Sequence, residues 1–551
     1  MTSISRSYEQ YFPFNIIRDE QRKAIEFALD TFLSSNKKYC LLQLAVGCGK
    51  SAVGVTVARY LAANPTQRLP DSADQNSGAY VLTTQKVLQE QYLSDFGPNK
   101  RNLLCSIKSS SNYSCLHFKD QNCGESRRVL NKLAKQLAGT EFFKCCKTQC
   151  PYSIDKQAFI NSPISVTNFS YFLAETMYAK KLEPRSLLIV DECHNIESEL
   201  GKFIEVTFSE RFARDILKCK IPALNTQDNV FEWIKNSYKP LLAKHLKKIE
   251  KMMESNFNSG STVFGEYGKQ YEMLDKHICK VNRFITSYDP ENWIMNLIKP
   301  IAGSRGARKF EFKSIDVSGF SHDMLFRFGD KVLMMSATVV DKDTFCKSIG
   351  LDPNQVDYID ISSPFPVENR RVHYLPIGSM SMKNIDKTLP ILVETIKLLL
   401  NQHSDVKGII HCVSFKIAQY IFQNVKSDRL LIHNSENRDK VLKEHISNNK
   451  PTVLLSPSMM EGVDLADDSS RFQVLCKVPF PYLGDLVVKK RMAKNNIWYN
   501  FQTAKSIMQA LGRSVRNEND YATSYILDAD WERFYNRSRT LFSSDFSKTL
   551  M

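Results

Sequence analysis

Short apolar runs of strand type alternate with amphipathic segments through the first part of the chain. The spacing of apolar positions predicts helices over residues 19–32, 51–63 and 86–96, and strands over residues 39–44, 79–84 and 186–190. The same rhythm of a strand followed by a helix returns at residues 164–173. Such alternation is typical of an α/β domain built on a parallel sheet.

A second series of strand-like runs follows a Pro-containing segment near residues 364–372, which we interpret as a hinge. Helical patterns separate the runs of this series, which lie at residues 407–412, 430–432, 452–456, 473–478 and 524–527. Two alternating series predict two parallel-sheet domains.

Two segments interrupt the first series. Residues 105–156 contain cysteines, polar runs and one basic helical stretch at residues 126–137. Residues 203–300 contain long Lys-rich helical stretches, such as 241–253, and we interpret them as a helical insertion. Strand-like runs at residues 309–317 and 331–335 are expected to return the chain to the first domain.

Composition and charge narrow the class of protein. The 551 residues are enough for about three or four domains. No apolar run approaches the roughly 18 residues of a membrane span, and the first residues lack the order of a signal peptide. We therefore expect a soluble intracellular protein, of cytoplasmic, nuclear or viral location. The formal net charge of +15 fits a polyanionic partner, nucleic acid first; a basic surface that serves only solubility is the alternative, and charge alone does not separate the two.

The cysteines are unevenly distributed. Of 14 in the chain, Cys105, Cys115, Cys123, Cys145, Cys146 and Cys150 fall within one short segment. Without a secretory signal, this local cluster indicates metal or iron–sulfur ligation more than a disulfide framework.

The stretch QLAVGCGKS, residues 43–51, joins a predicted strand to a predicted helix in the manner of a P-loop. Gly47 and Gly49 allow backbone N–H groups to close on phosphate oxygens. Lys50 supplies a charge for the β- and γ-phosphates, and Ser51 supplies a hydroxyl for Mg²⁺. Leu44 stands where the first glycine of the full motif belongs, so an ordinary Gly turn is the alternative.

Acidic and hydroxyl residues follow two of the predicted strands. Asp191 and Glu192 come directly after an apolar strand, where an Asp can hold Mg²⁺ and a Glu can polarise the attacking water. The hydroxyls of Ser336 and Thr338 end another strand and can link the metal site to a neighbouring surface, although a simple turn is equally compatible.

Gln509, Arg513 and Arg516 are spaced by four and three residues, which places them on one face of a helix. An arginine aimed at a transferring phosphate acts as an arginine finger. A solvated basic face is the alternative.

Further polar residues end predicted strands and suit contacts to a sugar–phosphate backbone without sequence preference. Tyr171 can also stack on a base. For each of these residues ordinary loop packing is an equal alternative: Thr83, Thr84, Asn168, Tyr171, Ser414 and Ser456.

The motifs QLAVGCGKS, DECH, SAT, EGVDL and QALGRSVR, in this order, resemble those of superfamily 2 helicases. The stretch IKSSSNYSC, residues 107–115, is similar to the Asn-Tyr-x-Cys start of the iron–sulfur domain in the XPD/DinG family of DNA helicases. Cys150-Pro151-Tyr152 resembles the end of that domain. The resemblance covers nearly the whole chain and is weakest over residues 203–300, where the family carries its helical Arch domain.

The resemblance implies an α/β fold with two RecA-like motor domains, the first carrying an iron–sulfur insertion and a helical Arch-like insertion. Motor domain 1 comprises residues 1–104, 157–202 and 305–362, the last part including the hinge. The iron–sulfur insertion takes residues 105–156, the Arch-like insertion takes residues 203–304, and motor domain 2 takes residues 363–551.

The resemblance also implies roles for single residues. Arg18 and Gln21 would recognise adenine or its surroundings, and His194 would couple ATP to the rest of the motor, with Ser336 and Thr338. Gly462 and Asp464 would lie at the interdomain edge of the nucleotide, and Gln509, Arg513 and Arg516 would close the site. The ligands of a [4Fe–4S] cluster would be Cys115, Cys123, one of Cys145 and Cys146, and Cys150; zinc is the alternative metal.

These features together predict an ATP- and Mg²⁺-dependent DNA helicase that moves on single-stranded DNA and unwinds duplexes in repair, replication or recombination. The family implies 5′→3′ polarity and leaves the Arch-like insertion as a surface for protein partners. The alternatives are a translocase that does not unwind, an RNA-directed helicase, and a metal-stapled binding module.

Overall fold

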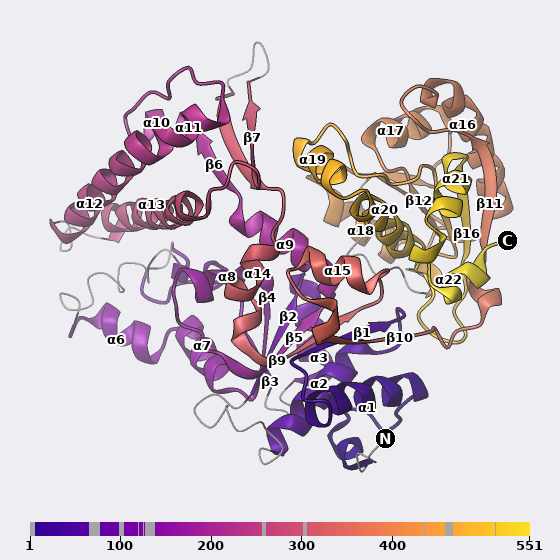
Figure 1. Cartoon of the computed structure of the whole chain (residues 1–551), viewed down its shortest axis with the longest axis horizontal. Helices are drawn as coiled ribbons and strands as arrows, with labels where there is room; N and C mark the ends of the chain where they lie inside the picture. Colours follow the sequence, from indigo (N-terminus) through magenta and orange to yellow (C-terminus); the bar gives the residue numbers. More distant parts are fainter. Residues whose placement is uncertain are drawn as a thin grey trace.

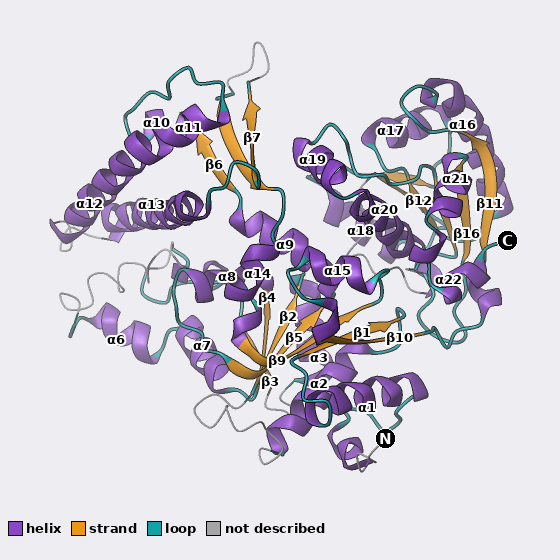
Figure 2. Cartoon of the chain, in the orientation of Figure 1, coloured by secondary structure: helices purple, strands orange, loops and turns teal. Residues whose placement is uncertain are grey.

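A computed structural model describes residues 6–64, 78–97, 104–118, 121–124, 126, 138–255, 261–300, 306–434, 436–457, 465, 467–512 and 514–551. In this part of the chain the strands form two larger sheets and one small sheet (Figures 1 and 2). The first larger sheet and its helices, which include the N-terminal helices α1 to α3, lie in the lower part of Figure 1. The second larger sheet and its helices form a separate body on the right. The small sheet and the helices α12 and α13 project away from the first sheet.

The first sheet has seven described strands in the order β10-β1-β9-β5-β2-β4-β3. Every pair in it is parallel. The strands are β1 (Tyr39–Leu44), β2 (Ala79–Thr83), β3 (Leu104–Ser106), β4 (Ile164–Asn168), β5 (Arg185–Asp191), β9 (Gly329–Ser336) and β10 (Val356–Ile361).

Both faces of the first sheet are buried, which explains why its strands are continuous apolar runs. Alternate residues contribute to two different hydrophobic clusters: Leu41 and Leu82 to one, Leu42 and Val81 to the other. The first cluster includes residues of α7 (Pro151–Asn161), α8 (Phe169–Met177), α9 (Ile196–Ile204) and α15 (Lys342–Ser348). The second includes residues of α1 (Asp19–Leu33), α2 (Lys50–Ala63) and α3 (Lys86–Phe96).

The second sheet has six described strands in the order β11-β16-β15-β12-β14-β13, again all parallel. The strands are β11 (Val372–Gly378), β12 (Gly408–His411), β13 (Leu430–Ile432), β14 (Val453–Ser456), β15 (Phe472–Leu475) and β16 (Thr523–Asp528). The helices of this part are α16 (Ile385–Gln402), α17 (Phe415–Asn424), α18 (Arg438–Ser447), α19 (Leu486–Lys494), α20 (Asn496–Leu511), α21 (Asp530–Arg537) and α22 (Ser544–Thr549).

The two sheets match the α/β prediction, with some strands unforeseen. β3, β10 and β11 had no predicted counterpart, and β11 begins at Val372, the last residue of the segment interpreted as a hinge. The domain boundary expected after residue 362 falls between β10 and β11, in the interval that joins the two sheets. Most of the predicted helix at residues 126–137 lies outside the described residues.

The insertion after α9 is not purely helical, which corrects the prediction for residues 203–304. It contains an antiparallel sheet of order β6-β8-β7, formed by β6 (Val206–Ser209), β7 (Trp293–Ile298) and β8 (Lys309–Ser314). The run at residues 309–317 was expected to return the chain to the first domain. β8 instead belongs to the small antiparallel sheet, so this expectation was wrong. The helices are α10 (Glu210–Asp215), α11 (Gln227–Trp233), α12 (Lys239–Ser255), α13 (Ser261–Ser287) and, after β8, α14 (Ser318–Met324).

The cysteine-containing segment packs on the first sheet. Its described helices are α6 (Glu141–Thr148) and α7. Phe142 of α6 and Tyr152 of α7 belong to the same hydrophobic cluster as Leu82 of β2. Buried Arg185, at the start of β5, donates to the carbonyl oxygens of Ile160 (2.6 Å) and Ser162 (2.9 Å) at the end of α7. The segment is thus held directly against the sheet.

None of the described helices combines the length and the apolar character that a membrane crossing requires.

Candidate functional site

The P-loop lies between β1 and α2, at the carboxyl edge of the first sheet, where ligands of open α/β sheets bind. Gly47 and Gly49 have φ values of +81° and +75°, a region that favours glycine. A side chain at Gly47 would collide with the carbonyl oxygen of Arg516, and one at Gly49 with the amide of Gln21. Glycine is therefore required at both positions by the turn, at Gly47 by the close approach of the segment after α20, and at Gly49 by the close approach of α1.

Arg18 and Gln21, at the start of α1, brace the P-loop backbone. The Arg18 guanidinium Nη2 donates to the carbonyl oxygen of Gly47 at 2.9 Å, and Gln21 Nε2 donates to that of Cys48 at 3.1 Å. Gln21 Oε1 accepts the backbone N–H of Arg18 at 3.0 Å. The structure thus places both residues against the phosphate loop, beside the position where a nucleotide would bind.

Asp191 ends β5 and is buried. Its Oδ2 accepts a hydrogen bond from the hydroxyl of Tyr92 at 3.0 Å, and its Oδ1 accepts the N–H of Glu192, also at 3.0 Å. Burial, helped by the negative charge of Glu192, raises the pKa of Asp191 to about 6, although the charge of Lys50 acts in the opposite direction. A bound cation would favour the ionised carboxylate.

Lys50, Glu192, His194 and Ser336 form a continuous polar chain. Lys50 Nζ lies 3.5 Å from Glu192 Oε1, and His194 Nδ1 lies 3.3 Å from Glu192 Oε2 and 2.8 Å from Ser336 Oγ. The chain joins β5 and β9 because these strands are neighbours, with Asp191 in register with Met335. The side chains predicted from the P-loop, DECH and SAT motifs are therefore brought together.

The partners of His194 define its neutral tautomer. The Asn195 side-chain amide donates to His194 Nε2 at 2.9 Å, which leaves Nδ1 to carry the proton and donate toward Ser336 Oγ. Ser336 Oγ also accepts the backbone N–H of Thr338 at 3.0 Å. The imidazole thus connects Glu192 to the loop after β9 through a chain of polar contacts.

Helix α20 and the segment that follows it supply the opposite wall of the cleft. A cavity of about 440 Å³ is lined by Glu192, His194 and Thr338 on one side and by Gln509 and Arg516 on the other. Gln509 Oε1 and Thr338 Oγ1 are buried and have no hydrogen-bond partner within the described residues, so acceptors remain available to a ligand. Arg513, Gly462 and Asp464 lie outside the described residues.

Three of the six residues expected to contact nucleic acid are buried inside the protein. Tyr171 is 6% exposed, and its hydroxyl bonds to that of Tyr152 at 3.0 Å; its predicted stacking on a base is therefore wrong for this arrangement. Thr83 and Ser456 are also buried. Asn168 and Ser414 cap the helices α8 and α17 by accepting backbone N–H groups, and Thr84 lines the cleft.

The cysteines of the 105–150 segment converge without forming a complete metal geometry. Cys115, Cys123, Cys146 and Cys150 are buried in one hydrophobic cluster, whereas Cys145 is half-buried. Cys123 Sγ and Cys150 Sγ are 3.1 Å apart, and burial together with Cys115 and Cys150 raises the pKa of Cys145. No trio of His, Cys, Asp or Glu in the described ranges is arranged to hold a metal ion. The donor set itself, four or five thiols, suits an iron–sulfur cluster or zinc.

Three site residues were not anticipated. Asn195 directly follows the DECH motif, so its position in the sequence could have identified it as a site residue. Tyr92 belongs to no motif, and its position in the sequence gave no such indication. Gln43 is a polar residue in an otherwise apolar strand, which could have indicated a structural or functional role. Its Oε1 accepts the N–H groups of Val339 (2.7 Å) and Val340 (3.0 Å), which joins the strand before the P-loop to the loop after SAT.

Comparisons with known proteins agree with this geometry. Residues 398–549 match the helicase C-terminal domain, and residues 15–221 match the type III restriction enzyme, res subunit. A probable ATP-dependent helicase of Methanocaldococcus jannaschii is 20% identical, over 95% of this chain and 93% of that protein. The ATP-dependent DNA helicase DinG of Photobacterium profundum is 24% identical, over 35% of this chain and 30% of its own length. A solved XPD helicase has a TM-score of 0.60 at 15% identity, covering 96% of this chain and 99% of its own, and shows the fold.

Proposed function

Since this chain belongs to the XPD/DinG type of superfamily 2 helicases and is an ATP-hydrolysing helicase, we propose that its ATP cycle drives movement along single-stranded DNA and the unwinding of duplex DNA. The observation that carries this proposal is the polar chain from Lys50 through Glu192 and His194 to Ser336, faced by Gln509 and Arg516. It provides a hydrolytic site on one domain and a sensor for it on the other.

The hydrolytic roles follow from the contacts. Lys50, Ser51 and the P-loop amides bind the phosphates, and Asp191 is the carboxylate that would hold Mg²⁺, which neutralises phosphate charge when bound. Glu192 orients the attacking water and accepts its proton as the new P–O bond forms and the bond between the β–γ bridging oxygen and the γ-phosphorus breaks. Lys50 Nζ lies 3.5 Å from Glu192 Oε1, so the carboxylate is close to the lysine that would bind the γ-phosphate.

The second domain completes the site. Arg516 lines the cleft opposite Glu192 and supplies positive charge to the transferring phosphoryl group, together with Arg513. Gln509 offers an unpartnered buried acceptor in the same cleft. Hydrolysis and release of phosphate remove the negative charge of the γ-phosphate that these residues contact. The two domains then separate, and the protein moves along the single-stranded DNA.

We propose that Cys115, Cys123, Cys150 and one of Cys145 and Cys146 bind a [4Fe–4S] cluster, with zinc as the alternative. Burial and the charges of nearby Cys115 and Cys150 raise the pKa of Cys145, whereas Cys146 is buried in the same hydrophobic cluster as these thiols, so both stay candidates for the remaining ligand. Because a metal site often supplies folding free energy, the cluster would hold this segment rigid against the sheet as a wedge. Iron and sulfide analysis with an absorbance spectrum of anaerobically purified protein tests this; colourless protein that contains zinc supports the alternative.

The assignment of DNA as the substrate rests on the net charge of the chain and on the proteins that it resembles. The net charge of +15 favours a nucleic-acid partner, and the matched DinG is a DNA helicase by name. We therefore propose DNA, with 5′→3′ polarity, and the β6-β8-β7 insertion as the surface for protein partners.

One experiment separates the possible activities. ATP hydrolysis and strand separation are measured with single-stranded DNA, RNA, and duplexes that carry a 5′ or a 3′ tail, for the wild type and for Lys50→Ala. We expect hydrolysis stimulated by DNA, unwinding of the 5′-tailed duplex, and loss of both in Lys50→Ala with single-strand binding retained. Stimulation without unwinding indicates a translocase, and stimulation by RNA alone indicates an RNA-directed enzyme. Near-normal hydrolysis in Lys50→Ala contradicts the assignment of the site.

A further inference from the structure

One face of α20 docks against the DECH element of the first domain. Trp498, Gln502, Lys505 and Gln509 are spaced by four, three and four residues, so they share this face. Lys505 Nζ donates to the carbonyl oxygen of His194 at 3.4 Å, and Gln509 lines the cleft with Glu192 and His194. The helix that leads to the arginine motif is thus attached at several points to the segment that contains the water-activating residue.

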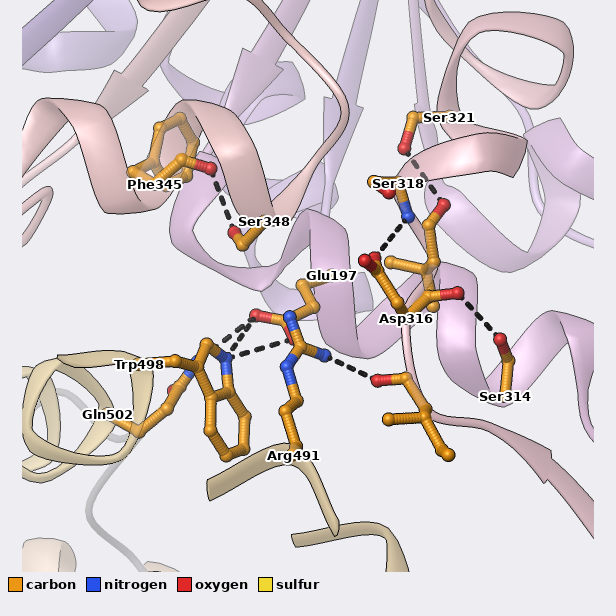
Figure 3. A network of polar contacts seen from close by, with 12 residues as sticks. Glu197, Ser314, Asp316, Ser318, Ser321, Phe345, Ser348, Arg491, Trp498 and Gln502 are labelled. Atoms are coloured by element: carbon orange, nitrogen blue, oxygen red, sulfur yellow. Dashed lines mark hydrogen bonds and ion pairs between the residues drawn. The ribbon is translucent and has the colours of Figure 1, made fainter. Parts of the chain in front are cut away.

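The strongest attachment is centred on Glu197, in the first turn of α9, five residues after Glu192. Its carboxylate accepts Trp498 Nε1–H at 3.2 and 3.3 Å and Gln502 Nε2–H at 3.1 Å, and it forms an ion pair with Arg491 of α19. Figure 3 shows Trp498, Gln502 and Arg491 converging on Glu197 from the second domain. One carboxylate therefore receives three donors from across the domain interface.

The network is buried and extends to the insertion. The side chains of Glu197 and Arg491 are only 14% and 12% exposed, and the Arg491 guanidinium lies 4.3 Å from the centre of the Trp498 ring. Arg491 also donates to the carbonyl oxygen of Ile315, just after β8, at 3.1 Å. Lys494 of α19 donates to the carbonyl oxygen of Glu291, just before β7, at 3.0 Å. α19 and α20 thus connect the first domain, the second domain and the root of the insertion.

We propose that Glu197 is a positioning residue for ATP hydrolysis, which acts through α20 to set Gln509 and Arg516 against Glu192. This inference rests on the proposed roles of those three residues. Glu197 is not among the residues that line the cleft, so it does not contact the nucleotide. It acts instead by fixing the position and orientation of α20 relative to the first domain. Because such alignment matters in the transition state and the P-loop is untouched, its loss lowers kcat and leaves the KM for ATP nearly unchanged.

The test compares two buried carboxylates of equal exposure. Glu197→Gln keeps the size of the side chain and removes the charge that pairs with Arg491. The matched control is Glu175→Gln: Glu175 is also 14% exposed and pairs with Lys156 at 2.5 Å, but within one domain. For DNA-stimulated hydrolysis we expect Glu197→Gln to lower kcat about 10-fold with KM within about 2-fold, as for a misplaced catalytic group. Glu175→Gln is expected to lower thermal stability with kcat unchanged.

A milder variant covers the case in which Glu197→Gln fails to fold. Trp498→Phe keeps an aromatic ring beside Arg491 but removes the N–H donor to Glu197 together with part of the indole ring. We expect a decrease in kcat of about 3-fold, the scale of one hydrogen bond. In the double variant the two decreases should be less than additive in free energy, since both act through one contact.

Two results would overturn the inference: wild-type kcat in folded Glu197→Gln and Trp498→Phe, or a decrease in Glu175→Gln as large as in Glu197→Gln. Failure of the site assignment is recognised separately, because Lys50→Ala would then retain hydrolysis. If Lys50→Ala is inactive and Glu197→Gln is normal, the proposed function stands and only the positioning role is wrong.

Discussion

The two walls of the nucleotide cleft are organised differently. On the first domain, Lys50, Glu192, His194 and Ser336 are joined to one another by contacts of 2.8 to 3.5 Å. On the second domain, Gln509 has a buried acceptor with no partner in the described ranges, and it lies on α20, which is docked on α9. The first wall is therefore assembled by its own sheet, whereas the second depends on how the domains meet.

Under the proposed function, this difference would let the protein bind ATP on the first domain and hydrolyse it only when the second domain meets the first. Neighbouring parallel strands bring the ends of β5 and β9 together whatever the state of the second domain. The position of Arg516 relative to Glu192 is instead a property of the interface, so it can respond to nucleotide and to nucleic acid.

The largest effect is expected from the first wall. Glu192→Gln removes the base while keeping the size of the side chain, and we expect kcat to fall about 10³-fold, within the range of lost general-base catalysis. ATP binding, followed by a fluorescent analogue, should persist because the P-loop is unchanged. Substantial turnover in this variant would assign the base to another residue.

A smaller effect is expected outside the cleft, in the cysteine segment. Cys150→Ser removes one buried thiol and should lower strand separation by about 10-fold or more while DNA-stimulated hydrolysis falls much less, because loss of the proposed metal would unfold the segment and leave the cleft intact. Cys105→Ser, at a half-buried cysteine outside the proposed ligand set, is the control. Equal losses of both activities in Cys150→Ser would show that the segment is part of the hydrolytic machinery.

A still smaller effect is expected from the contact between His194 and Ser336 within the first wall. Ser336→Ala removes the hydroxyl that meets His194 and accepts the N–H of Thr338, so we expect hydrolysis to fall about 3-fold, the scale of one or two hydrogen bonds. Unwinding per ATP hydrolysed should fall further, which a paired measurement on one preparation detects. An unchanged ratio would remove Ser336 from the coupling route.

The smallest effect concerns stability. Because the pKa of Asp191 is raised to about 6 in the folded protein, its ionised form is disfavoured by burial and by Glu192. The folded state binds this proton more tightly than the unfolded state, so stability falls as pH rises from about 4 to about 6. Asp191→Asn should therefore stabilise the nucleotide-free protein at pH 7.5 by about 1–3 kcal/mol, and the gain should vanish near pH 4. Denaturant unfolding at both values checks this; an equal gain at pH 4 would indicate a different cause.

The motif residues that end strands were predictable because parallel sheets bring strand ends together, and Asp191, Glu192 and Ser336 are found as expected. The antiparallel sheet in the insertion was not predictable from periodicity, since β6 is a strand of four residues among helices. Tyr171 illustrates another limit: an aromatic side chain after a strand fits both a base-stacking surface and a core, and tertiary packing decided for the core.

The contacts that join the domains were the least predictable. Glu197 lies in the first turn of a helix, where an acidic residue is favourable in any protein, so its charge carried no functional signal. Its partners Arg491 and Trp498 are distant in sequence, and only the docking of two domains reveals them. The positions of the motif residues follow from each domain's topology, whereas the coupling residues follow from the interface.

The most direct test of a site divided between two domains is to measure ATP affinity and turnover on one preparation of Arg516→Ala. We predict an affinity within about 3-fold of wild type and turnover at least about 10²-fold lower, since an arginine finger acts on the transition state. Turnover near the wild-type rate would contradict the central claim, because the first domain would then hydrolyse ATP without the second.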